Sequence, residues 1–161
     1  MQFAYFESPI GLLEIKASTR GLVSVQRVEE KQEVPEASAG WAVQAKEQLR
    51  EYFAKERRQF DLTFDWSDGT AFNQSVWQIV KDIPYGHTTT YSAIAEQLEN
   101  PKAVRAVGLA NKYNPIAIIV PCHRVIAKSG DLQGYFYGLD TKRQLLELEN
   151  PESFARQGSL F

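Results

Sequence analysis

This chain of 161 residues has little cysteine and little histidine: one cysteine, Cys122, and two histidines, His87 and His123. One cysteine excludes an internal disulfide framework and a cysteine-rich zinc cluster, and the remaining ligands are too few for a structural zinc site. We therefore expect no bound metal. The same scarcity is typical of a reducing, intracellular setting, which we expect to be cytoplasmic, or nuclear in a eukaryote.

The chain also lacks long apolar runs. No segment of about 18 consecutive apolar residues is present, so we expect no membrane-spanning helix and no membrane partner. The first residues, MQFAYFESPIG, have neither the basic nor the apolar region of a signal peptide. Charged residues of both signs are interspersed, and the apolar fraction of 43% is ample for a packed core.

Acidic residues are missing from one long stretch. The net charge of −2 argues against a nucleic-acid-binding protein, but residues 101–130 contain no Asp or Glu and carry five basic residues: Lys102, Arg105, Lys112, Arg124 and Lys128. A basic surface on a mildly acidic protein can face phosphate groups. Taken alone, a chance distribution explains this stretch more simply.

The first 70 residues read as a small α/β domain. Alternating apolar and polar residues predict strands over 2–8, 12–18 and 22–30, separated by turns, and a further strand over 59–66. Apolar residues at helical spacing predict a helix over 41–56. The sequence SDGT at 67–70 marks the expected boundary. We therefore predict an N-terminal α/β domain over residues 1–70 with a small antiparallel sheet.

Helical patterns dominate residues 71–161. They predict helices over 70–83, 90–99, 100–113 and 140–149, with Asn100 and Asp140 as N-caps and Pro101 at the first helical position. Two helices joined by so short a turn form a helix-turn-helix, although spacing alone favours a plain helical hairpin. The apolar run over 116–120 predicts a buried extended segment that ends at Cys122. The predicted fold is thus α+β at the N-terminus and mainly helical, winged-helix-like, at the C-terminus.

The helix predicted over 100–113 has unusually small side chains. Ala103, Ala106, Gly108 and Ala110 would let its backbone approach another surface closely, and Arg105 is the long, planar exception. That surface is either a neighbouring helix or a DNA groove. A glycine within a helix costs about 1 kcal/mol of stability relative to alanine, so a packing or binding role is expected for Gly108.

The Cys122–His123 pair is the candidate reactive centre. Only the thiolate is a strong nucleophile, and a neighbouring base or positive charge must favour it. Adjacent residues of an extended chain point to opposite faces, so His123 would reach the sulfur through a water molecule. A carboxylate that orients the imidazole is also wanted, and Glu147 and Glu149 are candidates. An isolated pair of this kind is nevertheless more often an inert, buried cysteine beside a histidine.

The surrounding motifs change that assessment. The stretch NPIAIIVPCHRVIAKSGDLQGY, with PCHRV at 121–125, closely resembles the active-site signature of the O6-alkylguanine-DNA alkyltransferases, which are suicide DNA-repair proteins. FNQSVWQIVKDIPYGHTTTYSAIA and NPKAVRAVGLANKYNP resemble the helix-turn-helix of this family, and GYFYGLDTKRQLLELE resembles its closing segment. The resemblance runs from about Phe72 to Glu149, and SPIGLLEIKA resembles the N-terminal domain more weakly.

The resemblance implies a role for each matching residue. Cys122 would accept the alkyl group, His123 would take the thiol proton through a water molecule, and Glu149 would hold His123. Asn114 would act as the hinge before the active site. The resemblance also assigns DNA or substrate binding to Tyr91, Ala103, Arg105, Gly108, Arg124, Val125, Tyr135 and Phe136. Among these, Tyr91 would donate to the base, Arg105 would fill the gap left by the flipped nucleotide, and the carbonyls of Val125 and Cys122 would accept from the guanine 2-amino group.

The implied activity is direct DNA repair by a monomer. One alkyl group would move irreversibly from O6 of guanine, or O4 of thymine, in double-stranded DNA to the cysteine. Minor-groove binding and nucleotide flipping would come first, and neither metal nor cofactor would be needed. The sequence departs from the family at Phe136 and Tyr137, where many relatives have small residues. These side chains predict poor repair of bulky adducts such as benzyl; the alternative is that the two rings stack on a benzyl group and favour its repair.

Three other functions fit parts of the sequence. A noncatalytic alkyltransferase-like lesion sensor is disfavoured because Cys122 is present. A helix-turn-helix regulator would need polar, base-reading side chains, and KAVRAVGLAN has few. A cysteine hydrolase would need an oxyanion hole, for which the sequence gives no independent sign.

Overall fold

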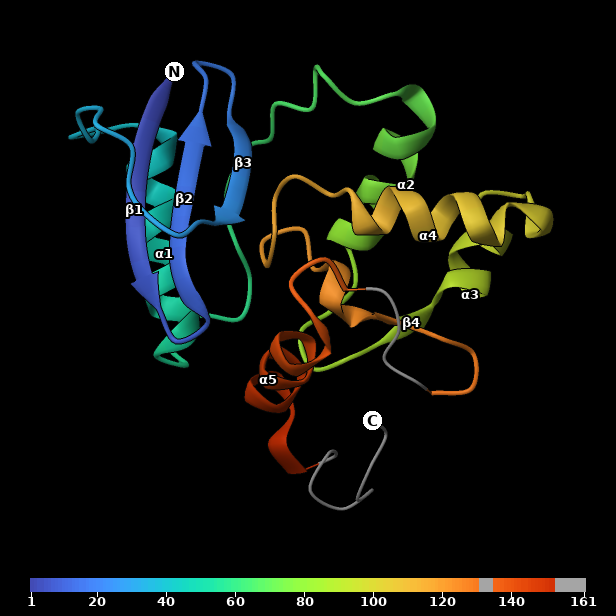
Figure 1. Cartoon of the computed structure of the whole chain (residues 1–161). Helices are drawn as coiled ribbons and strands as arrows, with labels where there is room; N and C mark the ends of the chain where they lie inside the picture. Colours follow the sequence, from blue (N-terminus) through green and yellow to red (C-terminus); the bar gives the residue numbers. More distant parts are fainter. Residues whose placement is uncertain (131–134, 153–161) are drawn as a thin grey trace. The chain divides into compact units, whose positions relative to one another are not determined.

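The computed structural model describes residues 1–130 and 135–152 and divides the chain into two units (Figure 1). The first unit contains Met1–Ser67 and, from much later in the chain, Pro115–Ile119; the second contains Asp68–Asn114 and the described residues from Val120 onward. No pattern in the sequence indicates that residues 115–119 belong with the first unit. The division into an N-terminal domain of residues 1–70 and a C-terminal domain of residues 71–161 stays a prediction.

The first unit contains a three-stranded antiparallel sheet in the order β1-β2-β3, as the sequence predicts. Its strands are β1 (Gln2–Ser8), β2 (Gly11–Ala17) and β3 (Leu22–Arg27). The tight turn between β1 and β2 requires Gly11, which has a φ of +118°. Alternation of apolar residues along these strands puts Leu13, Ile15 and Val25 in the core.

Helix α1 (Trp41–Phe53) packs on β1 and β2 and covers one face of this sheet (Figure 1). Its buried residues, Ala42, Ala45, Leu49 and Tyr52, follow helical spacing.

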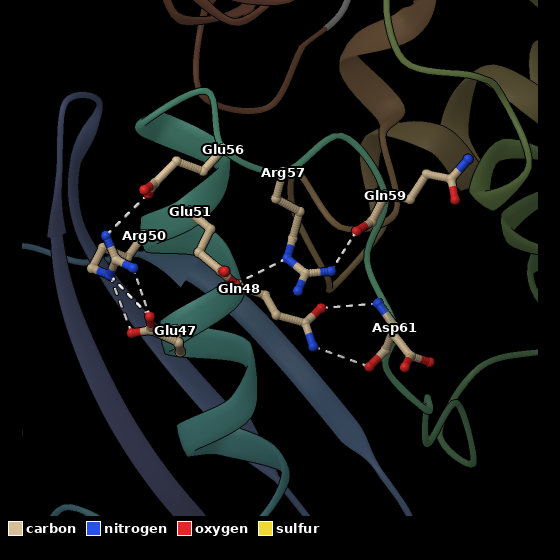
Figure 2. Close-up of polar contacts among 8 residues, drawn as sticks. All are labelled: Glu47, Gln48, Arg50, Glu51, Glu56, Arg57, Gln59 and Asp61. Atoms are coloured by element: carbon tan, nitrogen blue, oxygen red, sulfur yellow. Dashed lines mark hydrogen bonds and ion pairs between the residues drawn. The ribbon is translucent and has the colours of Figure 1, made fainter.

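Charged side chains also lie on α1 and in the turn that follows it (Figure 2): those of Glu47, Arg50 and Glu56 are exposed, and those of Glu51 and Arg57 are half-buried. Arg50 lies 2.7 Å from Glu47 and 3.3 Å from Glu56, and a separate pair joins Arg57 to Glu51 at 3.1 Å. We call these five residues the α1 surface cluster.

The strand predicted over 59–66 is wrong in extent. Only Phe64 forms a ladder contact, a parallel bridge to Leu22. The aromatic residues of this alternating stretch pack on other rings instead of lying in a sheet. The ring of Phe60 lies 5.6 Å from that of Tyr52, and the ring of Phe64 stacks on that of Trp66 at 5.2 Å. A short segment thus borders β3 without extending the sheet.

The extended run predicted over 116–120 is buried but turns back on itself. Only Ile116 bridges to a strand, at Val25. The amide of Ile119 donates to the carbonyl of Ala117 at 2.8 Å, and Ile118 has a φ of +70°, a left-handed value that is rare for a β-branched residue. An apolar run predicts burial correctly, but it does not predict the direction of the backbone.

The second unit is mainly helical. Its elements are α2 (Ala71–Lys81), β4 (Thr89–Thr90), α3 (Tyr91–Gln97), η1 (Pro101–Ala103), α4 (Val104–Lys112), η2 (Cys122–Arg124), β5 (Val125–Ile126) and α5 (Leu139–Glu149). Helix α4 packs on both α2 and α3, and only the turn around Leu98 and the short η1 separate α3 from α4. This confirms the predicted helix pair. No helix in the described part of the chain is long and apolar enough to cross a membrane.

Two predicted helix caps are wrong. Asn100 precedes η1, with Pro101 at its start as predicted, but the side chain of Asn100 makes no capping hydrogen bond, and α4 itself begins only at Val104. Helix α5 begins after Gly138, which has a φ of +96°, so Asp140 lies within the first turn. A negative charge there still interacts favourably with the helix dipole.

Candidate active site

Cys122 lies at the start of η2 and is 5% exposed. A tight turn centred on Pro121 (φ −81°, ψ 65°) leads into it, with the amide of Cys122 donating to the carbonyl of Val120 at 2.8 Å. Cys122 and His123 therefore belong to a short helical turn, and the expected placement on opposite faces of an extended chain is wrong.

His123, Arg124 and Glu149 form a buried ionic cluster between η2 and α5. Nε2 of His123 lies 2.7 Å from Oε2 of Glu149. Arg124 donates to both oxygens of the same carboxylate, from Nε at 2.8 Å and from Nη2 at 2.9 Å, and from Nη1 to the carbonyl of Ile83 at 2.7 Å. Glu149 thus joins the two consecutive residues that follow the cysteine.

The carboxylate fixes the tautomer of His123. An ionised carboxylate only accepts hydrogen bonds, so Nε2 must carry the proton. Nδ1 is then the basic nitrogen, and it is buried with no hydrogen-bond partner among residues 1–130 and 135–152. The imidazole is therefore prepared to accept a proton at Nδ1.

Burial and neighbouring charges shift the pKa values of this cluster. Burial alone would raise the pKa of Glu149, but its contacts with His123 and Arg124 outweigh burial and lower it well below the ordinary value. Burial lowers the pKa of His123, although Glu149 opposes this. At neutral pH the resting cluster is a neutral imidazole beside an Arg–Glu ion pair.

Two side chains oppose the effect of burial on the thiol. Burial raises the pKa of Cys122, whereas a hydrogen bond from Asn114 and the charge of Lys142 lower it. Asn114 also donates from Nδ2 to the carbonyl of Val120 at 2.9 Å, which ties the end of α4 to the residue before Pro121. Asn114 therefore lies where the predicted hinge would be.

Lys142 is a site residue that the sequence reasoning missed. It is fully buried on α5, and Nζ donates to the carbonyl of Val125 at 2.6 Å. Burial lowers its pKa to about 8, and the charge of Cys122 opposes this shift. A signal was present, since Lys142 shares the apolar face of α5 with Leu145, Leu146 and Glu149 at helical spacing.

Tyr91, at the start of α3, is the aromatic residue near the cysteine. Burial raises its pKa to about 12, as does the charge of Cys122, while a hydrogen bond from Asn111 acts in the opposite direction. Nζ of Lys142 lies 6.0 Å from the centre of the Tyr91 ring. The phenol is thus protonated at neutral pH and can donate a hydrogen bond.

One face of α4 is exposed and basic. Arg105 and Lys112 lie there with the apolar side chains of Val104 and Leu109, while Ala103 and Gly108 are half-buried. A Cβ atom added to Gly108 would lie 4.0 Å from the Tyr91 ring, an ordinary contact, so packing against this ring does not require glycine.

Arg124, Tyr135 and Phe136 complete the predicted set. Arg124 is not at the surface expected of a DNA-contacting residue; it is 5% exposed because Glu149 and Ile83 bind its guanidinium. Tyr135 is buried and Phe136 is 59% exposed, and the ring of Tyr137 lies 5.1 Å from that of Phe136. Most of the turn expected before them, at 131–134, lies outside the described residues.

Two family descriptions match the chain over nearly its whole length. Residues 71–151 match "6-O-methylguanine DNA methyltransferase, DNA binding domain", and residues 1–66 match "6-O-methylguanine DNA methyltransferase, ribonuclease-like domain". A methylated-DNA–protein-cysteine methyltransferase of Methanosarcina acetivorans is 49% identical over 154 residues, covering 92% of this chain and 98% of the relative. One from Mycolicibacterium paratuberculosis is 45% identical over 161 residues, covering 95% and 94%.

Solved structures of similar proteins share the fold. The Mycobacterium tuberculosis OGT in complex with DNA has a TM-score of 0.83 and 45% identity, and the match covers 94% of each chain. An O6-methylguanine DNA methyltransferase from Methanococcus jannaschii has a TM-score of 0.64 and 32% identity, with 91% and 92% covered.

Proposed function

The chain belongs to the 6-O-methylguanine DNA methyltransferase family, whose members repair DNA by moving an alkyl group to a cysteine, and we propose that this chain transfers the alkyl group from O6 of guanine in duplex DNA to Sγ of Cys122. The observation that carries the proposal is the 2.7 Å contact between His123 and Glu149, because it prepares a base in the residue next to the only cysteine.

The transfer is a displacement at the alkyl carbon. The thiol proton passes to Nδ1 of His123, through a water molecule as the family resemblance implies, and Glu149 stabilises the resulting imidazolium. The bond from sulfur to the alkyl carbon forms as the bond from that carbon to O6 breaks, and the bonding pair leaves with the guanine. The base takes up one proton and departs neutral, while a thioether remains on Cys122. Because a thioether has no easy reversal, each chain acts once.

The lesion must leave the base stack to reach a buried thiol. Rotating a nucleotide out costs a few kcal/mol, and a planar, charged side chain can occupy the gap. Arg105 suits this role because it is exposed in the first turn of α4, close to the small residues Ala106 and Gly108. We assign the basic face of α4 to the minor groove, where readout is largely independent of sequence.

The flipped base would meet donors and acceptors at the site. The carbonyl of Cys122 already accepts from the backbone amide of Val125 and from Nδ2 of Asn111, and the carbonyl of Val125 accepts from Lys142. The 2-amino group implied to bind these two carbonyls would therefore share or displace one of these contacts. Tyr91 would donate to the base. The same chemistry extends to O4 of thymine, and one copy of the chain suffices because every assigned residue comes from it.

The rings of Phe136 and Tyr137 set the proposed adduct range. They stand edge to face in the segment before α5. The family resemblance implies that this segment borders the lesion, so the two rings would leave less room for a bulky adduct. We propose that methylguanine is repaired well and benzylguanine poorly. Equal single-turnover rates on the two adducts would refute this.

Intact-protein mass spectrometry tests the main proposal. The chain is mixed with excess duplex DNA that contains O6-methylguanine, and the Cys122→Ser variant is the control. We expect the mass to increase by one methyl group, located on the Cys122 peptide, with no second addition. Tight binding of the lesion without a mass change would instead indicate a lesion sensor and overturn the proposal.

A further inference from the structure

We propose that Asn111 is a positioning residue that directs the hydroxyl hydrogen of Tyr91 away from the protein and toward the flipped base, while it holds the backbone carbonyl of Cys122. This inference rests on the proposed function, because it concerns how the leaving base is met. Neither the sequence reasoning nor the family resemblance assigned a role to Asn111.

The position of Asn111 supports this role. It lies in the last turn of α4, is 2% exposed, and donates from Nδ2 to the carbonyl of Cys122 at 3.2 Å. A carbonyl oxygen only accepts hydrogen bonds, so the amide of Asn111 has a fixed orientation, with its nitrogen toward Cys122. The amide therefore presents N–H groups, not its oxygen, to this side of the site.

The second contact of Asn111 is with Tyr91. Its hydrogen bond lowers the pKa of the phenol, against the larger effect of burial. Because Oδ1 of Asn111 makes no hydrogen bond to any described residue, this bond joins Nδ2 to the phenol oxygen, which accepts it. The hydroxyl of Tyr91 therefore does not donate to Asn111, and its hydrogen is available to another acceptor. An asparagine in the reverse orientation would accept that hydrogen and withdraw it from the base.

The unused atom of Asn111 argues against a purely structural role. Oδ1 is buried and has no hydrogen-bond partner within the described part of the chain. Leaving a buried acceptor unpaired costs stability, and a leucine of similar size would avoid that cost. A polar residue in this place is explained by the orientation that it gives to its two neighbours.

The test uses two variants of similar size. Asn111→Leu removes both donors, and Asn111→Asp keeps the shape but offers only acceptors to Tyr91 and Cys122. Single-turnover methyl transfer is measured at saturating O6-methylguanine duplex, together with duplex affinity. We expect Asn111→Leu to slow transfer about tenfold, the effect of losing one oriented hydrogen bond, and Asn111→Asp to slow it more. Duplex affinity should not change.

Two further readouts separate positioning from structure. Iodoacetamide alkylates the thiol with an iodide leaving group that needs no proton, so its rate should be unaffected by Asn111→Leu. In the Tyr91→Phe background, Asn111→Leu should have little further effect on methyl transfer. Slowing of both reactions, or equal slowing with and without the Tyr91 hydroxyl, would overturn the proposal. If the unsubstituted chain transfers no methyl group, the proposed function itself has failed, which is a distinct outcome.

Discussion

The shortest ion pairs of the α1 surface cluster and of the buried cluster of His123, Arg124 and Glu149 have nearly the same length but very different surroundings. Arg50 and Glu47 approach to 2.7 Å with their side chains 49% and 58% exposed (Figure 2). Arg124 and Glu149 approach to 2.8 Å with side chains 6% and 1% exposed.

Contact distance alone therefore does not indicate how much an ion pair contributes to stability or function. Water and salt screen an exposed pair and replace its hydrogen bonds when it separates. A buried pair has no such substitute, so removing one partner leaves an uncompensated charge inside the protein. The buried cluster is also where burial and charge shift pKa values, which suits acid–base chemistry.

Removing the buried carboxylate should have the largest effect. Glu149→Gln leaves the guanidinium of Arg124 without its counter-ion, and we expect the free energy of unfolding to fall by about 3–5 kcal/mol. Methyl transfer should slow about 100-fold, because His123 loses the group that sets its tautomer. Urea unfolding and single-turnover kinetics measure the two effects.

Glu147→Gln is the matched control for this substitution. Glu147 is on the same helix, is 51% exposed, and pairs with Arg143 at 3.4 Å. It should change both quantities little. Equal effects of Glu147→Gln and Glu149→Gln would show that burial does not distinguish the two carboxylates.

Removing the buried lysine should have a smaller effect, mainly on the rate. The charge of Lys142 lowers the pKa of Cys122 and so favours the thiolate. Lys142→Met should raise the thiol pKa and slow methyl transfer about tenfold, comparable to the loss of one charged contact. The pH dependence of iodoacetamide alkylation reports the thiol pKa directly.

Lys128→Met provides the comparison, because Lys128 is exposed and lies six residues beyond the cysteine. It should leave the thiol pKa unchanged. An unchanged thiol pKa in Lys142→Met as well would contradict the role given to the buried charge.

Acid should weaken the fold through the buried cluster. Burial lowers the pKa of His123 below its ordinary 6.5, so at that pH the unfolded chain binds a proton more readily than the folded chain. The contribution of His123 to stability is therefore full above about pH 6.5 and is lost as the pH falls through its lowered folded-state pKa. The lowered pKa of Glu149 acts in the same direction at lower pH, since protonating it removes the partner of Arg124.

Thermal unfolding between pH 8 and pH 5 measures this loss as a decrease in Tm. The decrease should be smaller in His123→Asn and retained in His87→Gln, because His87 is exposed. If the His87 variant lost the pH dependence and the His123 variant kept it, the buried cluster would not be its source.

The sequence predicted the regular strands and helices better than it predicted which charged residues are buried. Alternation was enough for β1, β2 and β3, and helical spacing was enough for α1 through α5, since each element buries one regular face. Periodicity did not predict the burial of Arg124 and Lys142, because charged side chains are usually at the surface. Their burial is explained only by tertiary contacts, of Arg124 with Glu149 and of Lys142 with the carbonyl of Val125. The left-handed backbone of Ile118 had no sequence signal, because a β-branched residue rarely adopts it.

The smallest effect is expected at the α1 surface cluster. Arg50→Ala removes the contacts with Glu47 and Glu56, yet all three side chains are about half exposed, so water can solvate the two carboxylates that remain. We expect almost no change in Tm at physiological salt and no change in the rate of methyl transfer. Salt screens these exposed ion pairs in the unsubstituted chain, and because each pair contributes little to stability, their screening should hardly change Tm. A loss of Tm in Arg50→Ala as large as that in Glu149→Gln would mean that geometry outweighs burial, and the contrast between the two clusters would fail.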